Sequence, residues 1–170
     1  MNKKDFAEKI LKGRMAETLV EELLRESGNT VYRFGYEAIM QNLPQLKKSF
    51  DTDDDTVERI RAIPDFIVID KNNRPLLLEV KYRWNSNLHD DDHERLRRIK
   101  EYWKAKMIFV NRIEKPFFRV SNPPYVDDAG NLQWKPLIKD TDWKISTEVY
   151  EKFEGLVDKY LTPTLIEEKP

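Results

Sequence analysis

The chain has 170 residues, of which 30 are Lys or Arg and 31 are Asp or Glu, so its formal net charge is -1. This length fits one domain, and the near-neutral charge excludes bulk electrostatic attraction as the basis of nucleic-acid binding. Cysteine is absent, which excludes disulfide cross-links and thiolate metal sites. We expect a single domain over residues 1–170, with a loose tail from about residue 162, no membrane span and a cytoplasmic location.

The first half of the chain predicts one long helix and three strands. The helix covers about Lys4–Ser27 and ends at the glycine that follows. TVYRFGYE (30–37) favours a strand through its β-branched and aromatic residues. Residues 38–62 contain a proline, a short helical stretch and an acidic run, and we expect an irregular, solvated excursion there. Two further strands follow, DFIVID (65–70) and LLLEVKYR (76–83), joined by the turn-forming residues KNNRP.

The second half predicts two helices around a further strand pair. DDDHERLRRIKEYWKAK (90–106) has acids in its first turn and bases toward its end, as the helix dipole favours. MIFVNR (107–112) and PFFRV (116–120) are predicted strands, DDAGN (127–131) is a turn, and a last helix covers about Ser146–Leu161. This order of elements predicts an α/β domain with a central mixed β-sheet flanked by helices.

Charged residues interrupt the two apolar strands of the first half. Side chains alternate along a strand, so Glu79 and Lys81 point to the same face. If the connecting loop has three residues, 71–73, Asp65 falls opposite Glu79, whereas a two-residue loop puts the two carboxylates on opposite faces. Neighbouring carboxylates repel each other unless a cation or a shared proton intervenes. An odd loop length would therefore create a paired-carboxylate site.

The residue types at this site indicate a chemistry. A few oxygen ligands beside a substrate phosphate are what Mg²⁺ prefers. Lys81 adds a compact positive charge that could orient or deprotonate a water, or stabilise the phosphoryl transition state. Asp65, Glu79 and Lys81 thus predict metal-assisted phosphodiester hydrolysis. The alternative is a solvated hairpin in which Glu79, Lys81 and Arg83 form surface ion pairs and Asp65 caps a turn.

Glu17 is an anomaly in the first predicted helix. It lies in the middle of an otherwise apolar face that is formed by Phe6, Ile10, Gly13, Val20 and Leu24. Either it extends the carboxylate cluster, or it reaches water at the rim of this face and pairs with Arg14 or Arg33. Glu21, one turn later on the same side, is a second candidate.

Taken together, Glu17 in GRMAETLVEELLRESG, PDF at Asp65 and EVK at Glu79 and Lys81 resemble the PD-(D/E)XK nuclease superfamily, also called restriction-endonuclease-like. The layout is similar to its archaeal Holliday-junction-resolvase branch over about Gly13–Val110. The resemblance implies a restriction-endonuclease-like fold in which Asp65 and Glu79 hold Mg²⁺, with Mn²⁺ as a possible substitute. It also implies that Lys81 acts on the attacking water, that Glu17 supports the metal, that DNA is the substrate, and that a homodimer is possible.

Basic residues near the site are candidates for DNA contacts. Members of the superfamily often place a polar or basic residue on the helix after the Lys strand. The predicted nucleic-acid-binding residues are Arg83, Arg97, Arg98 and Lys100. The alternative for the last three is the solvated face of an amphipathic helix whose inward residues are Leu96, Ile99 and Trp103.

The two histidines of the chain are a second candidate for metal binding. His89 and His93 lie one helical turn apart and could chelate a transition metal, but at the acidic start of a helix they also fit a solvated cap.

We predict a Mg²⁺-dependent deoxyribonuclease, an endonuclease that cuts by direct attack of water. The alternative is a noncatalytic module that keeps the nuclease fold and binds nucleic acid or a protein.

Overall fold

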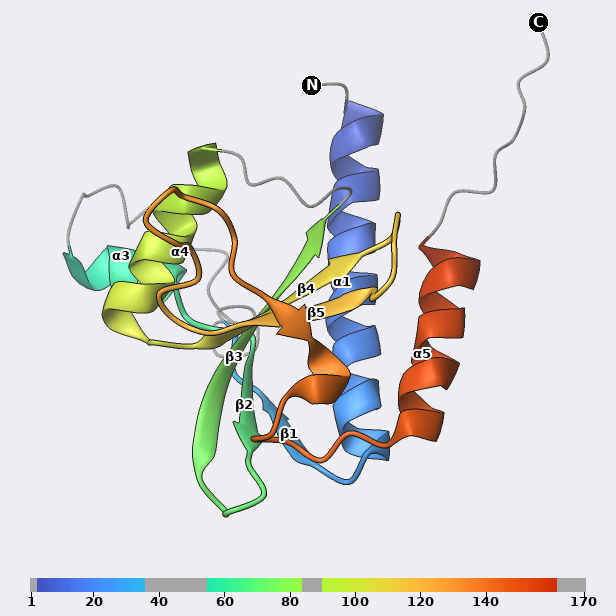
Figure 1. Ribbon diagram of the computed structural model, residues 1–170. Coiled ribbons are helices and arrows are strands. Elements are labelled where there is room, and N and C mark those ends of the chain that lie inside the picture. Colours follow the sequence, from blue (N-terminus) through green and yellow to red (C-terminus); the bar gives the residue numbers. More distant parts are fainter. Residues whose placement is uncertain (1–2, 36–54, 84–89, 162–170) are drawn as a thin grey trace, which may run out of the picture.

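The computed structural model describes residues 3–35, 55–83 and 90–161 (Figure 1). The helices of these segments are α1 (Lys3–Glu26), α3 (Asp55–Arg61), α4 (Asp90–Tyr102) and α5 (Thr147–Tyr160), with a 3-10 turn, η2, at Leu137–Lys139. The strands are β1 (Thr30–Arg33), β2 (Phe66–Ile69), β3 (Pro75–Arg83), β4 (Lys106–Asn111), β5 (Phe118–Ser121) and β6 (Lys135–Pro136).

The strands form one six-stranded sheet in the order β1-β2-β3-β4-β5-β6. The pairing of β3 with β4 is parallel and the other four pairings are antiparallel, so the sheet is mixed. Because α4 crosses over the sheet between β3 and β4, it lies on the opposite face from α1 and α5 (Figure 1). The predicted α/β class, a central mixed sheet flanked by helices, is therefore confirmed.

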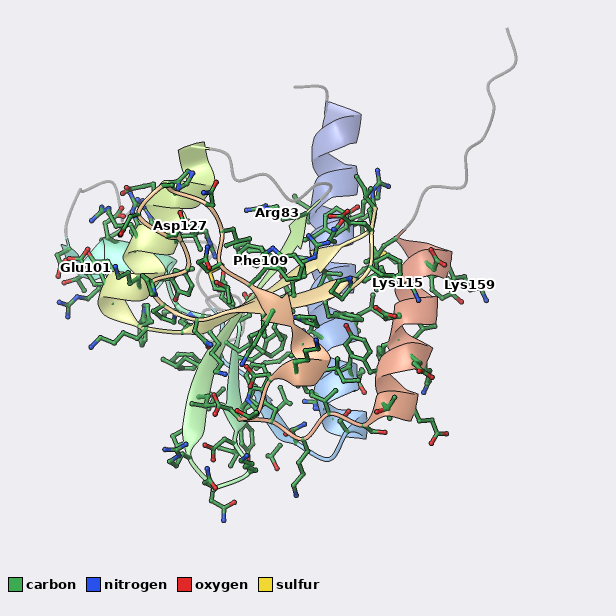
Figure 2. The ribbon with its side chains drawn as sticks, viewed as in Figure 1. Arg83, Glu101, Phe109, Lys115, Asp127 and Lys159 are labelled. Atoms are coloured by element: carbon green, nitrogen blue, oxygen red, sulfur yellow. The ribbon has the colours of Figure 1, made fainter. Side chains whose placement is uncertain are left out.

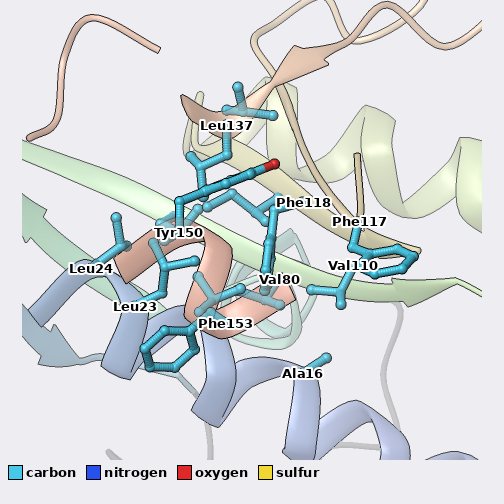
Figure 3. Packing of buried hydrophobic residues seen from close by; sticks show 14 of the residues in the cluster. Ala16, Leu23, Leu24, Val80, Val110, Phe117, Phe118, Leu137, Tyr150 and Phe153 are labelled. Atoms are coloured by element: carbon cyan, nitrogen blue, oxygen red, sulfur yellow. The ribbon is translucent and has the colours of Figure 1, made fainter. Parts of the chain in front are cut away.

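The larger core lies between the sheet and the helices α1 and α5. Ala16, Val20, Leu23 and Leu24 follow the helical period and are wholly buried, as Figure 3 shows for three of them. They pack with strand residues and with aromatic residues of α5, the labelled partners being Val80, Val110, Phe118, Tyr150 and Phe153. Each buried side chain of this size stabilises the fold by about 1.5–3 kcal/mol.

A second core covers the other face of the sheet. Met107 and Phe109 of β4 point to this face, since their neighbours Ile108 and Val110 point to the first core. They pack with Leu96 and Ile99 of α4 and with a group of residues from the adjoining segments, which are Ala62, Ala105 and Tyr125. β4 is buried on both faces, as expected for a central strand with a parallel neighbour.

Most predicted elements are confirmed, with shifted ends. α1 ends at Glu26, and Gly28 takes a positive φ of 86° and donates its N–H to the Arg25 carbonyl at 2.9 Å, as the sequence predicts. Ser146 caps α5 by accepting the Val149 N–H, and the DDAGN turn is present. The short strand β6 and the η2 turn were not predicted.

Two predictions need correction. The segment 38–62 was predicted as an irregular, solvated excursion with a short helical stretch. Asp55–Arg61 form a short helix, α3, but it is regular and packed, with acids in its first turn, bases in its last and Val57 buried. The helix predicted to reach residue 106 ends at Tyr102, because Lys104 adopts a positive φ of 50°. Residues 38–54, His89, Trp84 and the tail from residue 162 lie outside the described part of the chain. No helix that the structure describes is both long and apolar enough to cross a membrane.

The β2–β3 hairpin has the three-residue loop that the carboxylate pairing requires. Its register pairs Phe66 with Leu78 and Ile69 with Pro75. The Asp70 N–H donates to the Arg74 carbonyl at 2.8 Å, which closes the loop over residues 71–73. Continued one residue beyond β2, the register sets Asp65 opposite Glu79.

Candidate active site

The site lies where β2 begins and β3 runs on beyond it. The pairing of β2 with β3 starts at Phe66, whereas β3 continues to Arg83 alongside β4. Figure 2 shows Arg83 at the end of this extension. The chain after β1 is held against Asp65, whose carbonyl accepts the N–H groups of Phe34 at 2.8 Å and Gly35 at 3.0 Å. Asp65 is thereby fixed at the end of the sheet.

Glu79 is the most buried charged group of the site. Its side chain is 0% exposed, in the middle of β3. Oε1 lies 2.5 Å from Lys81 Nζ and accepts hydrogen bonds from Arg95, from Nη2 at 2.6 Å and Nε at 3.1 Å. Oε2 is buried and accepts no hydrogen bond from any residue in the described segments. A buried acceptor without a partner costs about 1–3 kcal/mol, so this oxygen is available to a ligand.

Asp65 contacts β3 through its side chain. Its Oδ2 accepts the backbone N–H of Val80 at 2.7 Å, next to Glu79 in sequence. This hydrogen bond lies where the β2–β3 pairing ends. The Asp65 carboxylate there takes the place of the backbone carbonyl that would otherwise accept the Val80 N–H. The contact fixes Asp65 toward β3 and thus brings the predicted carboxylate pair together.

The two carboxylates have pKa values that are shifted in opposite directions. Burial, and then the negative charge of Glu79, raise the pKa of Asp65 well above its ordinary value. Burial also acts to raise the pKa of Glu79, but the charges of Lys81 and Arg95 outweigh it and hold the pKa below its usual range. One member of the pair therefore stays ionised while the other is easily protonated, which is a common arrangement at functional sites.

Arg95 is the site residue that the sequence analysis missed. It comes from α4, is 42% exposed, and makes a charge-assisted contact with the same Glu79 oxygen, Oε1, that Lys81 contacts. It precedes the buried Ile99 by one helical turn and so lies at the edge of the inward face of α4. This position was the sequence signal that could have identified Arg95. The sequence analysis instead selected the basic residues that follow it on the same helix.

The basic residues that the sequence singled out on α4 have other partners. Arg97 pairs with Glu94 at 2.8 Å and with Glu101 at 3.0 Å, and Figure 2 shows Glu101 on the outer side of α4. Arg98 pairs with Glu94 at 3.0 Å and with Glu58 of α3. Hydrogen bonds from Arg97 and then Arg98 lower the pKa of Glu94 to about 2.

The structure therefore brings Arg95 to Glu79, rather than Arg97 or Arg98. Lys100 is exposed. Arg83 is partly buried at the end of β3 and donates to the Tyr82 carbonyl at 3.2 Å. A role for Arg83, Arg97, Arg98 and Lys100 in binding nucleic acid stays a prediction.

The two candidate glutamates of α1 separate in the structure. Glu21 is buried and belongs to a structural ion pair, because its carboxylate accepts Nε of Arg33 at 2.9 Å and contacts Arg25 at 2.8 Å. Glu17 is partly buried and lines an open pocket together with Asp65. Its charge acts to raise the pKa of Asp65, which places it within electrostatic reach of the carboxylate pair.

The carboxylate pair of Asp65 and Glu79 is the candidate metal site of the described residues. Over residues 3–35, 55–83 and 90–161 no group of three or more His, Cys, Asp or Glu side chains is placed to hold a metal ion. The donor set of Asp65 and Glu79 nevertheless fits a hard divalent cation, because both supply carboxylate oxygens and Glu79 Oε2 has no partner among the described residues. The role of Glu17 as a third ligand stays a prediction.

Comparisons with known proteins give a distant structural likeness. No protein-family model matches the chain, and no curated protein is similar to it in sequence. Among solved structures it is similar to Archaeoglobus fulgidus Hjc, described as a Holliday junction resolvase from an archaeal hyperthermophile. The identity is 17% and the TM-score 0.38, with 82% of this chain and 98% of that chain covered. The geometry of the site, and not this likeness, supports the function considered next.

Proposed function

We propose that the protein is a Mg²⁺-dependent DNA endonuclease that uses Asp65, Glu79 and Lys81. The observation that carries the proposal is the state of Glu79, a wholly buried carboxylate with Oε1 held by two cations and Oε2 without a partner in the described segments. A purely structural ion pair would be expected to satisfy both oxygens, since an unsatisfied buried acceptor is costly. Asp65 stands beside it with an unfavourable charge that a cation would compensate.

Each side chain has a definite part in this proposal. Asp65 and Glu79 would hold the cation, which would act as a Lewis acid on the phosphate oxygens and lower the pKa of a water. Lys81, 20% exposed and anchored 2.5 Å from Glu79 Oε1, presents its ammonium group at the edge of the site. There it can orient the attacking water and stabilise negative charge on the phosphate.

Arg95 is a positioning residue in the same scheme. By donating two hydrogen bonds to Oε1, it fixes the orientation of the Glu79 carboxylate and leaves Oε2 for a ligand. Because 42% of its side chain is exposed, the guanidinium can also turn toward a substrate phosphate once a cation neutralises Glu79.

The proposal is tested by metal binding and cleavage in parallel. The purified full chain is titrated with Mg²⁺ and Mn²⁺ in a calorimeter, and then incubated with duplex, single-stranded, flapped and four-way-junction DNA in either metal or in EDTA. We expect binding of both metals and cleavage that EDTA stops.

A matched pair of variants locates the site. Glu79→Gln should lose metal binding and cleavage together, since it removes the buried negative charge. Glu94→Gln, an equal substitution in the exposed ion pairs of α4, should keep both. Metal-independent DNA binding without cleavage, equal in both variants, would instead support the noncatalytic binding module.

A further inference from the structure

An open pocket adjoins the candidate active site. It has a volume of about 290 Å³ and lies between α1, the end of β1 and the start of β2. Asp65 belongs both to its lining and to the carboxylate pair, so that a ligand in the pocket would lie next to the proposed reaction centre. The role of this pocket is not explained by the carboxylates and Lys81 alone.

Two glycines keep the pocket open. A Cβ at Gly35 would lie 3.4 Å from Asp65 Cα and 3.7 Å from Asp65 Oδ1, in ordinary van der Waals contact, so a side chain there would take up space beside the carboxylate. A Cβ at Gly13 would meet no atom of the described residues within 4 Å, and this position of α1 lines the pocket. Glycine costs about 0.5–1 kcal/mol in a helix relative to alanine. Gly13 thus lowers helix stability at a position where no neighbour requires its small size.

The polar lining has balanced charges. Arg14 and Arg33 carry two formal positive charges, and Glu17 and Asp65 carry two negative ones. A site for a terminal phosphate needs an excess of cations, whereas this set of donors and acceptors matches the polar edge of a neutral ligand.

The apolar part of the lining fits the face of a planar ligand. Ile10, 42% exposed, and the buried Phe66 supply apolar surface, and an arginine can stack on a planar ring. Glu21 holds Nε and Nη2 of Arg33, so this guanidinium is fixed before any ligand binds and loses little entropy on binding. A nucleobase has the required size, planarity and polar edge.

We propose that this pocket takes one unpaired nucleobase of the DNA substrate, next to the phosphate that is cut. The inference rests on the proposed nuclease function and narrows its substrate to DNA with an unpaired nucleotide at the cleavage position. A base in a continuous duplex would first have to leave its stack, whereas an unpaired base enters without that cost. The protein should therefore prefer bulged DNA to a fully paired duplex.

The test fills the pocket without touching the carboxylates. Gly13→Leu places a side chain in the pocket from a helix position that favours leucine over glycine. Gly155→Leu is the matched control, since Gly155 is an exposed helix residue of α5 whose Cβ would also meet no atom within 4 Å in the part of the chain that the structure describes. Thermal melts should show both variants at least as stable as the wild type.

Binding is measured by fluorescence anisotropy in EDTA, with a duplex that carries a single-nucleotide bulge and with the same duplex fully paired. We expect the wild type and Gly155→Leu to bind the bulged DNA about tenfold more tightly, on the scale of one base-stacking contact. Gly13→Leu should bind both DNAs equally. Removal of the base from the bulged nucleotide should abolish the preference in the wild type and change nothing in Gly13→Leu.

The outcomes separate the two proposals. A bulge preference that Gly13→Leu removes supports the pocket assignment, even if no DNA is cut with Mg²⁺ and the nuclease function fails. Cleavage with no bulge preference, or a preference that survives in Gly13→Leu, overturns the pocket assignment while the nuclease function stands. An abasic bulge bound as tightly as a normal one would assign the pocket to the sugar-phosphate backbone and overturn the proposal, as would the absence of DNA binding.

Discussion

Replacing Asp65 by Asn should stabilise the metal-free protein at neutral pH. The substitution keeps the size of the side chain, and the amide oxygen can still accept the Val80 N–H hydrogen bond of 2.7 Å. What it removes is a negative charge that burial and Glu79 disfavour, as the raised pKa of Asp65 indicates. Under the proposed function the wild-type protein keeps this charge because a bound cation would need it, in keeping with the usual conflict between stability and function.

The size of the effect follows from the pairing of the two strands. Side chains directly opposite on neighbouring strands lie about 5 Å apart, and two unit charges at that separation repel by about 3 kcal/mol at an effective dielectric constant of about 20. Lys81 and Arg95 both contact Glu79 and offset the larger part of this repulsion. A gain of about 1 kcal/mol remains, which corresponds to an increase of about 2–4 °C in the melting temperature of a chain of this size.

The pH dependence has a definite sign. Because the pKa of Asp65 is raised in the folded state, its protonation stabilises the fold, and that contribution is complete below the unfolded value near pH 4 and is lost as the pH rises through the folded pKa. Asp65→Asn should therefore melt higher than the wild type at neutral pH, and the difference should vanish toward pH 4.

The assay is a series of thermal melts in EDTA between about pH 4 and 8, with Asp70→Asn as the matched control. Asp70 is at the other end of the same hairpin strand, and hydrogen bonds from the Arg74 and Asn72 N–H groups lower its pKa. Its replacement should destabilise the protein by a similar amount across this whole pH range, because the Asp70 pKa is lowered from an ordinary value that is already about 4. If Asp65→Asn melts no higher than the wild type while Asp70→Asn behaves as expected, the repulsion between Asp65 and Glu79 does not exist.

Three further outcomes are expected. Lys81→Ala should abolish cleavage while calorimetry shows Mg²⁺ binding at least as tight as in the wild type, because a competing cation has gone; weaker metal binding would contradict this division of roles. Glu21→Gln should cost about 2 kcal/mol in a denaturant melt, less than a fully buried ion pair because its arginine partners are half-exposed, and should leave metal affinity unchanged. The basic residues of α4 that were predicted to bind DNA are Arg97, Arg98 and Lys100. If they do, replacing all three by Ala should weaken DNA binding and reduce its dependence on salt concentration. An unchanged salt dependence would instead assign them to the solvated surface.

The sequence by itself determined the features that depend on local periodicity. The alternation of side chains along a strand was sufficient to predict Lys81 on the same face as Glu79, and it put Asp65 opposite Glu79 on the condition of a three-residue loop, which the structure then showed. The helical period of α1 predicted its buried face, and Gly28 predicted its end, because a left-handed residue after a helix favours glycine. These inferences needed only neighbours in sequence.

Tertiary structure decided which distant side chains complete the site. Glu17 and Glu21 lie one turn apart on α1, yet Glu21 is buried in an ion pair with Arg33 of β1 whereas Glu17 lines the pocket. The angle at which α1 crosses the sheet therefore determines which glutamate stabilises the fold and which one lies beside the site. Likewise, Arg95 reaches Glu79 because the crossover between β3 and β4 places α4 over that face. Packing angles depend on the whole buried interface, and no local period in the sequence encodes them.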